Sequence, residues 1–431
     1  MRAIRNTFRL LIPIALFMIT GVAFGSGFAL FEAGAKAVAM GGAFAATADD
    51  PSAIFYNVAG LAQQRRASVM FGGTAINFQN NFAGDASDLF TAGTSGSKYR
   101  AHTFVVPNAY AVVPFGGNLT FGVGVFAPFG LRTNWDQPWI GRYISSDANI
   151  KTVSLEPALA WQSSDGRFAI GGGPEYRRAK VILSRNSLAI NPFNNRITDV
   201  ANTYLASDWS HKWGWNVGLL VKPTPTWRIG LSYRAPMTMD FKGTATITQI
   251  PSGNAQFDAI VGSQLPPTQP VTTSISMSDF AYLGVATSAV GKWDIEADIV
   301  RNSWSRFKTL AINLVNTPAL SPPTRVSNWK NTFSYRLGGN RPVTPDWDIR
   351  LGALYDKNPQ PTFDISPILA DSDRVGVSFG VGYKLGPWVL DATEFALHFK
   401  KRGTNGQSQD NFNGTYKTDA NLVTVNLGYR F

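Results

Sequence analysis

The chain ends in Asn421-Leu-Val-Thr-Val-Asn-Leu-Gly-Tyr-Arg-Phe431. Alternate positions of this stretch carry two kinds of side chain: Val423, Val425, Leu427, Tyr429 and Phe431 on one face, and Leu422, Thr424, Asn426, Gly428 and Arg430 on the other. Side chains point alternately to the two faces of a strand, so this is a strand with one apolar and one mostly polar face. In a membrane barrel the apolar face meets lipid, the polar face lines the lumen, and aromatic residues gather at the interfaces. The pattern is typical of the last strand of an outer-membrane β-barrel.

The start of the chain has the features of a secretion signal. Arg2, Arg5 and Arg9 are positive, with no acidic residue near them, and residues 10–22 are apolar. Such a run is too short to span a bilayer comfortably, but it suits the core of a signal peptide. Small residues before position 26 then predict a signal peptide over residues 1–25. The alternative is an N-terminal membrane anchor, which is disfavoured because no other segment reads as a helical span.

Composition narrows the class of protein further. The 431 residues exceed a typical single globular domain of ~100–200 residues, but a large barrel accommodates them. There is no cysteine for disulfide or thiolate chemistry, while 41 glycines and 13% aromatic residues suit barrel bends and girdles. Without the three signal arginines, 36 basic residues face 28 acidic ones, a net charge of about +8. These charges form no clustered stripe, which argues against nucleic-acid binding.

Alternation along the chain predicts fourteen strands. They are expected at 67–80, 101–116, 119–129, 148–162, 167–185, 211–223, 226–250, 271–290, 292–313, 327–338, 346–357, 373–385, 387–402 and 416–431. The connections between them are alternately short, as at Gly386-Pro387, and long, as at 403–415. Bacterial outer-membrane barrels have an even strand number, short periplasmic turns and long extracellular loops. We therefore predict an all-β membrane protein, a 14-stranded antiparallel transmembrane β-barrel over residues 66–431, with both barrel ends in the periplasm.

Residues 26–65 do not read as barrel. Glycine and alanine dominate residues 33–48, and Asp49-Asp50-Pro51-Ser52 resembles a helix start, with proline near the first helical position. Large barrels can be filled by loops or helices, so we expect a small, partly helical N-terminal hatch in the lumen. The alternative, a flexible periplasmic tail, is disfavoured by the many apolar residues of this segment.

Blocks throughout the chain resemble one family. Ser26-Gly-Phe-Ala-Leu-Phe-Glu-Ala-Gly34, Ala39-Met-Gly-Gly-Ala-Phe44 and Ala48-Asp-Asp-Pro-Ser-Ala-Ile-Phe-Tyr-Asn-Val-Ala-Gly-Leu61 resemble the N-terminal hatch of the outer-membrane long-chain fatty acid transporter (FadL) family. Ala127-Pro-Phe-Gly-Leu131, Ile229-Gly-Leu-Ser-Tyr-Arg234 and Trp304-Ser-Arg-Phe307 resemble it too. The resemblance implies a fourteen-stranded barrel with a hatch that moves long-chain fatty acids or, in some branches, aromatic hydrocarbons. Val58 departs from the family pattern, which usually has proline there. Proline fixes φ, so Val58 leaves that turn less rigid.

The resemblance also implies a route for the solute. The solute would collect on apolar extracellular loops, enter a hydrophobic pocket between hatch and wall, and leave sideways where the third strand bends inward. The hatch and pocket residues expected on this basis are Phe28, Leu30, Phe31, Met40, Phe44, Phe55, Asn57, Val58, Ala59 and Leu61. The expected loops, 186–210 and 251–270, carry apolar residues, which often mark binding surfaces but could simply pack on one another.

The third strand contains Gly122, Gly124 and Pro128. Glycine in a strand favours a bend or the close approach of another backbone, and proline removes a ladder hydrogen bond. These three residues are the candidates for a lateral opening; the alternative is ordinary barrel curvature.

Charged residues at lumen-facing positions form a further group. By strand parity it consists of Asp294, Glu296, Asp298, Arg228, Arg234, Lys330, Arg336 and Arg350. Lysine or arginine facing lipid near the midplane costs ~2–4 kcal/mol, which favours lumen placement. We expect them to neutralise one another and hold the hatch by hydrogen bonds. An alternative is that one cation, not identified by sequence, meets a fatty-acid carboxylate.

The sequence does not favour catalysis. Its three histidines, His102, His211 and His398, are far apart, and no metal-ligand cluster, phosphate loop or nucleophile motif is present. We expect no cofactor and no metal. The prediction is a channel of the bacterial outer membrane for passive uptake of hydrophobic compounds, with long-chain fatty acids favoured over aromatic hydrocarbons. A general porin, a surface adhesin and an outer-membrane lipase are the alternatives. Expected partners are the hydrophobic ligand, outer-membrane lipid and lipopolysaccharide, and the barrel-assembly machinery through the C-terminal strand; a monomer is expected.

Overall fold

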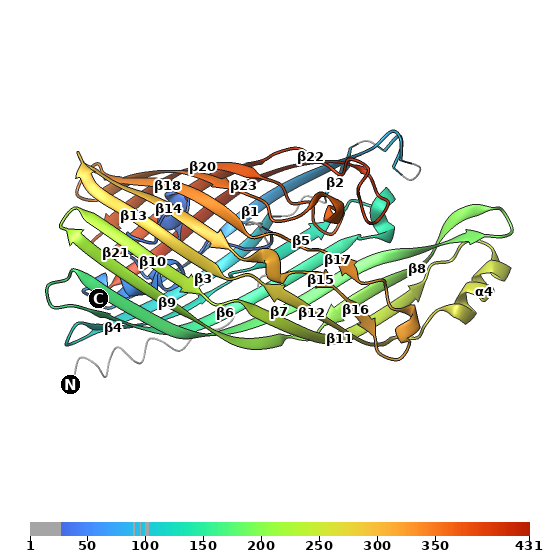
Figure 1. The fold of residues 1–431 in the computed structure, drawn as a ribbon, viewed down its shortest axis with the longest axis horizontal. Coiled ribbons are helices and arrows are strands. Elements are labelled where there is room, and N and C mark those ends of the chain that lie inside the picture. Colours follow the sequence, from blue (N-terminus) through green and yellow to red (C-terminus); the bar gives the residue numbers. More distant parts are fainter. Residues whose placement is uncertain (1–26, 89–90, 95, 100–102) are drawn as a thin grey trace.

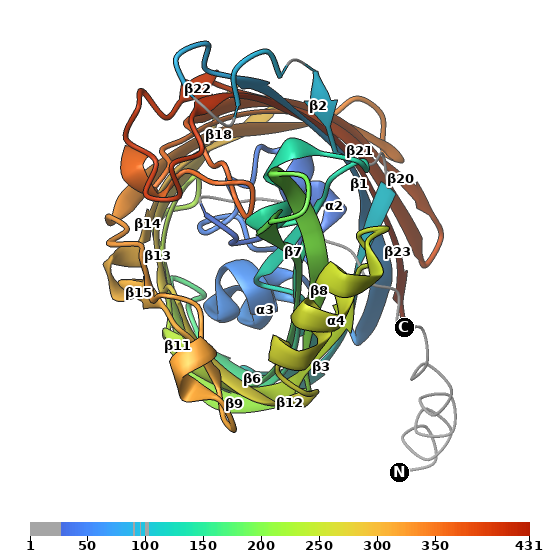
Figure 2. The same ribbon diagram turned by 90° about the vertical axis from the view of Figure 1, so that its right-hand side faces the viewer.

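The structure is a computed structural model and describes residues 27–88, 91–94, 96–99 and 103–431. The predicted signal peptide lies outside these residues. A long β-barrel encloses the first part of the described chain (Figures 1 and 2). Within the part of the chain described, no helix is both long and apolar enough to cross a membrane.

Fourteen antiparallel strands close the barrel, as the alternation predicts. In wall order they are β1 (Ser68–Gly84), β3 (Thr103–Phe115), β4 with β5 (Leu119–Phe126, Gly130–Asn134), β6 (Asp147–Gln162), β7 (Phe168–Asn191), β8 with β9 (Arg196–Ser207, Ser210–Thr224), β10 with β11 (Trp227–Arg234, Met237–Gln249), β12 with β13 (Gln269–Met277, Phe280–Val290), β14 with β16 (Trp293–Asn302, Ile312–Leu314), β18 (Thr332–Pro342), β19 (Trp347–Asp356), β20 (Arg374–Leu385), β21 (Trp388–Phe399) and β23 (Gly414–Arg430). Short strands add β2 (Ser97–Lys98) to β1 and β22 (Arg402–Gly403) to β23, and pair β15 (Thr309–Leu310) with β17 (Arg325–Val326).

The C-terminal strand closes the barrel. β23 pairs with β1 without interruption from Ser68↔Arg430 to Gly84↔Gly414. Val423 and Val425 are exposed on the outer wall, while Thr424 and Asn426 are buried on the lumen side. The short connections lie at the end that holds the C-terminus and the long ones at the other (Figure 1), so the short-turn end faces the periplasm.

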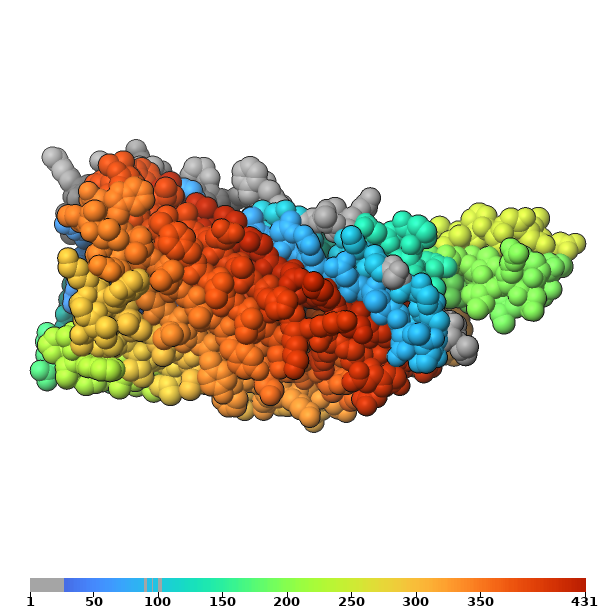
Figure 3. Space-filling model, turned by 90° about the horizontal axis from the view of Figure 1, so that it is seen from above, coloured from blue at the N-terminus to red at the C-terminus, as the bar shows by residue number. Residues whose placement is uncertain are grey.

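Two expected loops have regular structure instead. β7 and β8 pair up to Asn191↔Arg196, so most of residues 186–210 form a hairpin that projects beyond the barrel. Residues 251–270 contain the helix α4 (Ala255–Gln264), with Asn254 as its N-cap. The hairpin and α4 form the protrusion in green and yellow in Figures 1 and 3. Residues 182–189 of β7 are all partly exposed, so this part of the strand lacks the buried and exposed faces that mark a wall strand, and the loop prediction was wrong.

Residues 27–66, here called the N-terminal segment, lie inside the barrel (blue in Figure 2), as predicted for a hatch. The segment contains α2 (Ala35–Ala39), α3 (Ala53–Tyr56) and the 3₁₀ helix η2 (Val58–Gln63), and it is almost entirely buried. Glycines in the wall let it approach closely: a Cβ on Gly230 would lie 2.0 Å from the Ala45 carbonyl oxygen. Among the described residues, four further 3₁₀ turns lie between strands: η3 (Ile140–Tyr143), η4 (Trp304–Arg306), η5 (Pro318–Leu320) and η6 (Thr362–Asp364).

Candidate functional site

A groove of about 520 Å³ opens at the extracellular end of the barrel. Most of its lining is apolar: Ile144, Leu183, Leu205, Ile247, Leu265, Leu310, Ile312, Leu314, Leu320 and Ile368. Its volume is in the range of sites for small molecules. Of the apolar residues in the two expected loops, Leu205 and Leu265 line this groove. Phe257 and Val261 of α4 instead pack against Val200 of β8.

A small apolar cavity of about 50 Å³ continues from the groove toward the lumen. It shares Leu183, Leu310 and Ile368 with the groove, so the two adjoin. Phe28, at the start of the N-terminal segment, forms one wall. With Phe28 in this position, the cavity has too little room for an acyl chain.

Aromatic rings surround Phe28. Its ring centroid lies 4.5 Å from that of Trp304 and 5.9 Å from those of Phe307 and Trp329, mostly in edge-to-face or tilted arrangements. Such arrangements are favourable for aromatic pairs. The preceding Gly27 has a φ of +65° and its Cβ would lie 2.5 Å from Trp329, so glycine is required where the chain enters this cluster.

The other predicted pocket residues have a different place. Leu30, Phe31, Met40, Phe44, Phe55, Asn57, Val58, Ala59 and Leu61 are buried between the N-terminal segment and the wall, and none lines the groove or the cavity. Asn57 holds the segment in position, because its Nδ2 donates to the carbonyl oxygens of Ala45 (2.7 Å) and Leu219 (3.0 Å). Val58 is the first residue of η2 and follows Asn57 in an extended conformation.

The third barrel strand is interrupted after Phe126. Phe126 pairs with Ser154 and Gly130 pairs with Lys151, so three residues on this strand oppose two on β6. This is the geometry of a β-bulge, which bends a strand locally. Pro128, one of the three predicted residues, is at its centre.

The bulge is bonded to the N-terminal segment. The Leu30 amide donates to the Pro128 carbonyl and the Gly130 amide donates to the Phe28 carbonyl, both at 2.9 Å. Among the described residues, β5 pairs with β6 but not with β3, and residues 103–108 of β3 pair only with β1. The wall ladder is therefore interrupted beside the bulge, and Phe28 is tied to it.

Gly122 and Gly124 lie below the bulge. A Cβ on Gly122 would lie 3.0 Å from Ile54 and Leu61, and one on Gly124 would lie 2.9 Å from Tyr110. These glycines make room for the N-terminal segment and for Tyr110 beside β4. Of the three predicted residues, only Pro128 is at the interruption.

Two of the inward acids hold the N-terminal segment. One Asp298 oxygen accepts from the amides of Phe44 and Ala45 (2.9 and 3.0 Å), and Glu296 accepts from those of Ala46 and Thr47 (2.7 and 2.8 Å). Arg336 donates to the Gly42 carbonyl at 3.1 Å. The role expected from strand parity is thus visible as hydrogen bonds to the segment backbone.

The remaining inward cations are mostly paired. Arg228 contacts Asp294 at 2.5 Å, Arg234 contacts Glu156 and Glu175, and Arg350 contacts Asp391 at 2.5 Å. Lys330 was predicted to face the lumen from a strand, and this prediction was wrong. β18 begins only at Thr332, and Lys330 is exposed in the connection before it. Strand parity does not apply to a residue outside the strand.

One cation in the groove was not among the residues predicted from the sequence. Arg185 on β7 lines the groove, on the same face as Val181 and Leu183. Among the described residues, no carboxylate forms an ion pair with it. The other groove arginine, Arg325, is occupied by Asp364 (2.7 Å) and Asp410 (2.6 Å). The alternation in β7 that places Val181 inward also places Arg185 inward, so the strand parity contained this signal.

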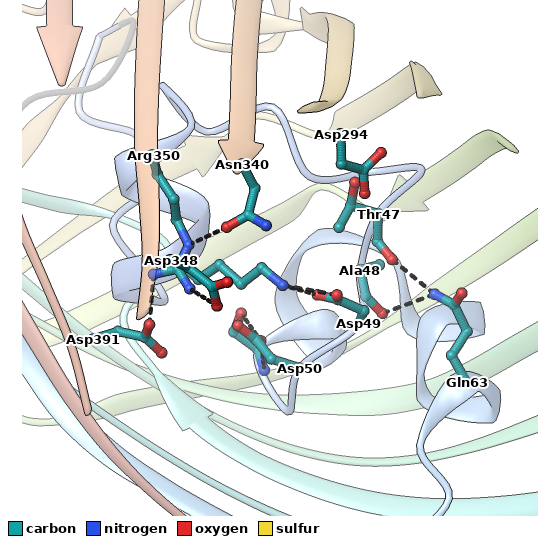
Figure 4. Close-up of polar contacts among 12 residues, drawn as sticks. Thr47, Ala48, Asp49, Asp50, Gln63, Asp294, Asn340, Asp348, Arg350 and Asp391 are labelled. Carbon is teal, nitrogen blue, oxygen red and sulfur yellow. Dashed lines mark hydrogen bonds and ion pairs between the residues drawn. The ribbon is translucent and has the colours of Figure 1, made fainter. Parts of the chain in front are cut away.

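The periplasmic end has the opposite character (Figure 4). A cavity of about 500 Å³ there is lined by charged groups of the N-terminal segment and the wall. Lys36 pairs with Asp49 at 2.7 Å, and Gln63 donates to the carbonyls of Thr47 and Ala48. An apolar solute passing here would have to desolvate these groups, which is costly.

Comparison with known proteins identifies the family. The profile of the family described as "Outer membrane protein transport protein (OMPP1/FadL/TodX)" matches residues 16–431. This chain belongs to that family. It is accordingly an outer-membrane transporter of hydrophobic compounds, and members of the family are transport channels and not enzymes.

Relatives of this FadL-family chain match it over most of their length. It is 23% identical to the "Long-chain fatty acid transport protein" of Salmonella typhi over 86% of this chain and 87% of that protein. It is 22% identical to "Outer membrane protein P1" of Haemophilus influenzae over 98% of both. A Pseudomonas aeruginosa FadL homologue shares the fold with a TM-score of 0.81 (21% identity, 94% and 100% coverage). The P. putida toluene transporter TodX does so with a TM-score of 0.74 (17% identity, 93% and 99% coverage).

Proposed function

We propose that this protein takes up long-chain fatty acids by passive diffusion. The solute enters the extracellular groove, moves into the cavity at Phe28, and leaves sideways into the bilayer beside the bulge at Pro128. The main support is the apolar continuity from groove to Phe28, together with the charged lining of the opposite end. A hydrophobic solute that passed the charged end would strip water from its charged groups, which is costly, whereas the bilayer beside the wall is apolar, so the wall is the favourable exit.

The choice of fatty acids rests on Arg185. A fatty acid has an acyl chain for the apolar groove and a carboxylate for a cation. Arg185 is the groove arginine left without an ion pair among the described residues, whereas Arg325 is held by two aspartates. An arginine–carboxylate contact is a strong, charge-assisted hydrogen bond. An aromatic hydrocarbon, the second candidate, would make no use of this group.

The bonds around Phe28 suggest how the exit opens. An acyl chain that enters the cavity must displace Phe28, and this movement strains the bonds of Phe28 and Leu30 to the bulge. Their loss frees residues 127–130, where the wall ladder is already interrupted. Residues 26–65 act as the hatch in this proposal. The route lies within one barrel, so a monomer suffices.

Uptake by cells tests the proposal. Cells whose only such transporter is this protein are given labelled oleate, and separately labelled toluene, with the barrel shown to be folded in the outer membrane. We expect saturable oleate uptake that excess toluene does not reduce. Toluene uptake without oleate uptake would move the assignment to aromatic hydrocarbons, and uptake of neither would contradict both.

A further inference from the structure

The outer wall has a hollow of about 380 Å³ that the transport route does not use. It lies where β20, β21, β23 and β1 adjoin, on the face seen in Figure 3, where the red strands meet the blue. Small side chains such as Ala396 and Ala420 contribute to its lining. Its position on the lipid side separates it from the groove and from the periplasmic cavity.

The hollow lies near the outer edge of the membrane. Trp388 and Tyr429 form an aromatic pair at the periplasmic ends of β21 and β23, with centroids 4.8 Å apart. Ala396 and Asn421 lie eight residues further along these strands. At ~3.3 Å per residue and a tilt of ~40°, this is a rise of about 20 Å within an apolar band of ~25 Å. The hollow is therefore at the depth where lipid headgroups of the outer leaflet begin.

Its chemistry is unusual for that depth. Strand register places His398, Asp419 and Gln79 side by side on the outer face, and Asn421 beside Asn77 in the next row. His398 contacts Asp419 at 2.7 Å. On β19, the residue eight positions after Trp347, and so at the same depth, is Tyr355. Its ring is part of the aromatic girdle and stacks on Tyr335. This part of the wall thus offers amides and a hydrogen-bonded histidine and aspartate, where its neighbour offers aromatic rings.

Cations lie just beyond the hollow, toward the cell exterior. Asn81 pairs with Lys417 on one side and with Lys98 on the other, so two exposed lysines flank one amide. Two carboxylates are also near: Asp419 is paired with His398, and Glu394 accepts from Asn421 at 3.0 Å. Because both carboxylates have these other partners, Lys417 and Lys98 are available to bind an anion of the membrane surface.

We infer that this hollow binds one lipopolysaccharide molecule of the outer leaflet. Its acyl chains would lie on Val375 and Val377, its sugar hydroxyls would meet the amides, and a phosphate would meet Lys417 and Lys98. A second copy of this chain fits less well, because a two-fold contact would set hollow against hollow and leave a void.

Lipid A binding to the refolded full-length barrel tests this inference. The variants are Ala396→Leu, which fills the hollow, and Lys417→Gln, which removes a cation. Matched controls on other parts of the outer wall are Ala297→Leu on β14 and Lys242→Gln on β11, both exposed. Bis-phosphorylated lipid A is titrated into each protein in detergent and counted by native mass spectrometry.

We expect one tightly bound lipid A on the wild type and both controls, and at least tenfold weaker binding to Ala396→Leu and Lys417→Gln. Removing one lipid phosphate should weaken binding to the wild type more than to Lys417→Gln. Equal binding by all five proteins would overturn the inference, since it would reflect the general barrel surface. A dimer of the wild type that Ala396→Leu dissociates would assign the hollow to a second copy. If one variant does not fold, the other still decides.

Discussion

In the proposed function, the choice of a fatty acid over an uncharged solute depends on Arg185. Replacing it with glutamine removes the charge but keeps a polar, though shorter, side chain. A charge-assisted contact contributes about 1.5–3 kcal/mol, so we expect at least a tenfold higher half-saturation concentration for oleate. Uptake of methyl oleate, which has no carboxylate, should be unchanged. Concentration-dependent uptake of both lipids by Arg185→Gln measures the effect.

Arg196→Gln is the matched control, because Arg196 is exposed at the tip of the same hairpin and does not line the groove. It should take up both lipids like the wild type. An equal loss of oleate and methyl oleate uptake in Arg185→Gln would show that Arg185 only shapes the groove.

Val58 occupies a position that suits proline. Val58 is the first residue of η2, a position where proline is common. Asn57 before it is extended (φ −158°, ψ 102°), which is the conformation that proline requires of the preceding residue. We expect Val58→Pro to stabilise the folded chain by about 0.4–1 kcal/mol, by restricting the unfolded state. Ala59→Pro is the opposing control, because the Ala59 amide donates to Asn57 at 3.2 Å and would be lost. Urea unfolding in lipid vesicles should rank Val58→Pro above wild type and Ala59→Pro below it.

Asp371 makes the extracellular connection between β19 and β20 sensitive to pH. Burial raises the pKa of its carboxyl to about 7, although Arg374 opposes the shift and Arg402 also lies near, while Asp356 adds to it. One oxygen accepts from the Gly27 amide at 2.9 Å, so this group contacts the start of the N-terminal segment. In the unfolded chain the pKa is ~4. Between these values only the folded state holds the proton, so its stability falls as pH rises from about 4 to about 7.

The comparison with Asp371→Asn isolates this contribution. The free energy of unfolding of the wild type minus that of Asp371→Asn should fall across that pH range and be level above it. A difference that is constant from pH 4 to pH 8 would contradict a raised pKa at Asp371.

At the scale of elements, the bulge in the third strand is the feature that can be removed most cleanly. Three residues, 127–129, oppose two on β6, so deleting Pro128 restores a regular register. The deletion also keeps Phe129 facing inward, opposite Thr152. We expect this variant to fold with a straight third strand and to lose most oleate uptake, because the lateral exit is closed. Uptake by cells with equal amounts of folded barrel measures this.

Pro128→Ala is its control, because it keeps the extra residue and should keep most of the uptake. Full uptake by the deletion variant would refute a lateral exit at this point. The double change Gly122→Val and Gly124→Val is a poorer test, since both new side chains would clash with the N-terminal segment or Tyr110.

The elements also show how far the sequence could be interpreted. Strict alternation predicted the fourteen wall strands because each buries one face and exposes the other, and the same parity placed Glu296 and Asp298 inward. Parity failed for Lys330, where the strand begins later than expected. The hairpin of β7 and β8 was missed because beyond the membrane neither face of a strand contacts lipid, so its side chains need not alternate between apolar and polar. The bulge depends on register between two strands, which a single strand's pattern does not contain.

On the scale of the whole molecule, the barrel is polar at its periplasmic end, apolar at its groove, and filled between by the N-terminal segment. That segment is bonded to the wall on several sides: to β14 through Glu296 and Asp298, to β18 through Arg336, and to the bulge through Phe28 and Leu30. The hydrogen bonds to β14 hold the N-terminal segment in place, whereas those to the bulge must break when a solute follows the proposed route. The two sets can therefore be tested separately.

Weakening the bonds to β14 should open a water path through the molecule. Replacing Glu296 and Asp298 together by alanine removes the acceptors of four backbone amides of residues 44–47, each bond contributing about 0.5–3 kcal/mol. We expect low ion conductance from the wild type in planar bilayers and frequent openings from the double variant. Asp294→Asn, on the same face of β14 but paired with Arg228, should conduct like the wild type. Deleting residues 27–66 should give the largest conductance. If the wild type already conducts as the deletion variant does, the protein is an open porin for polar solutes, and the N-terminal segment does not act as a hatch.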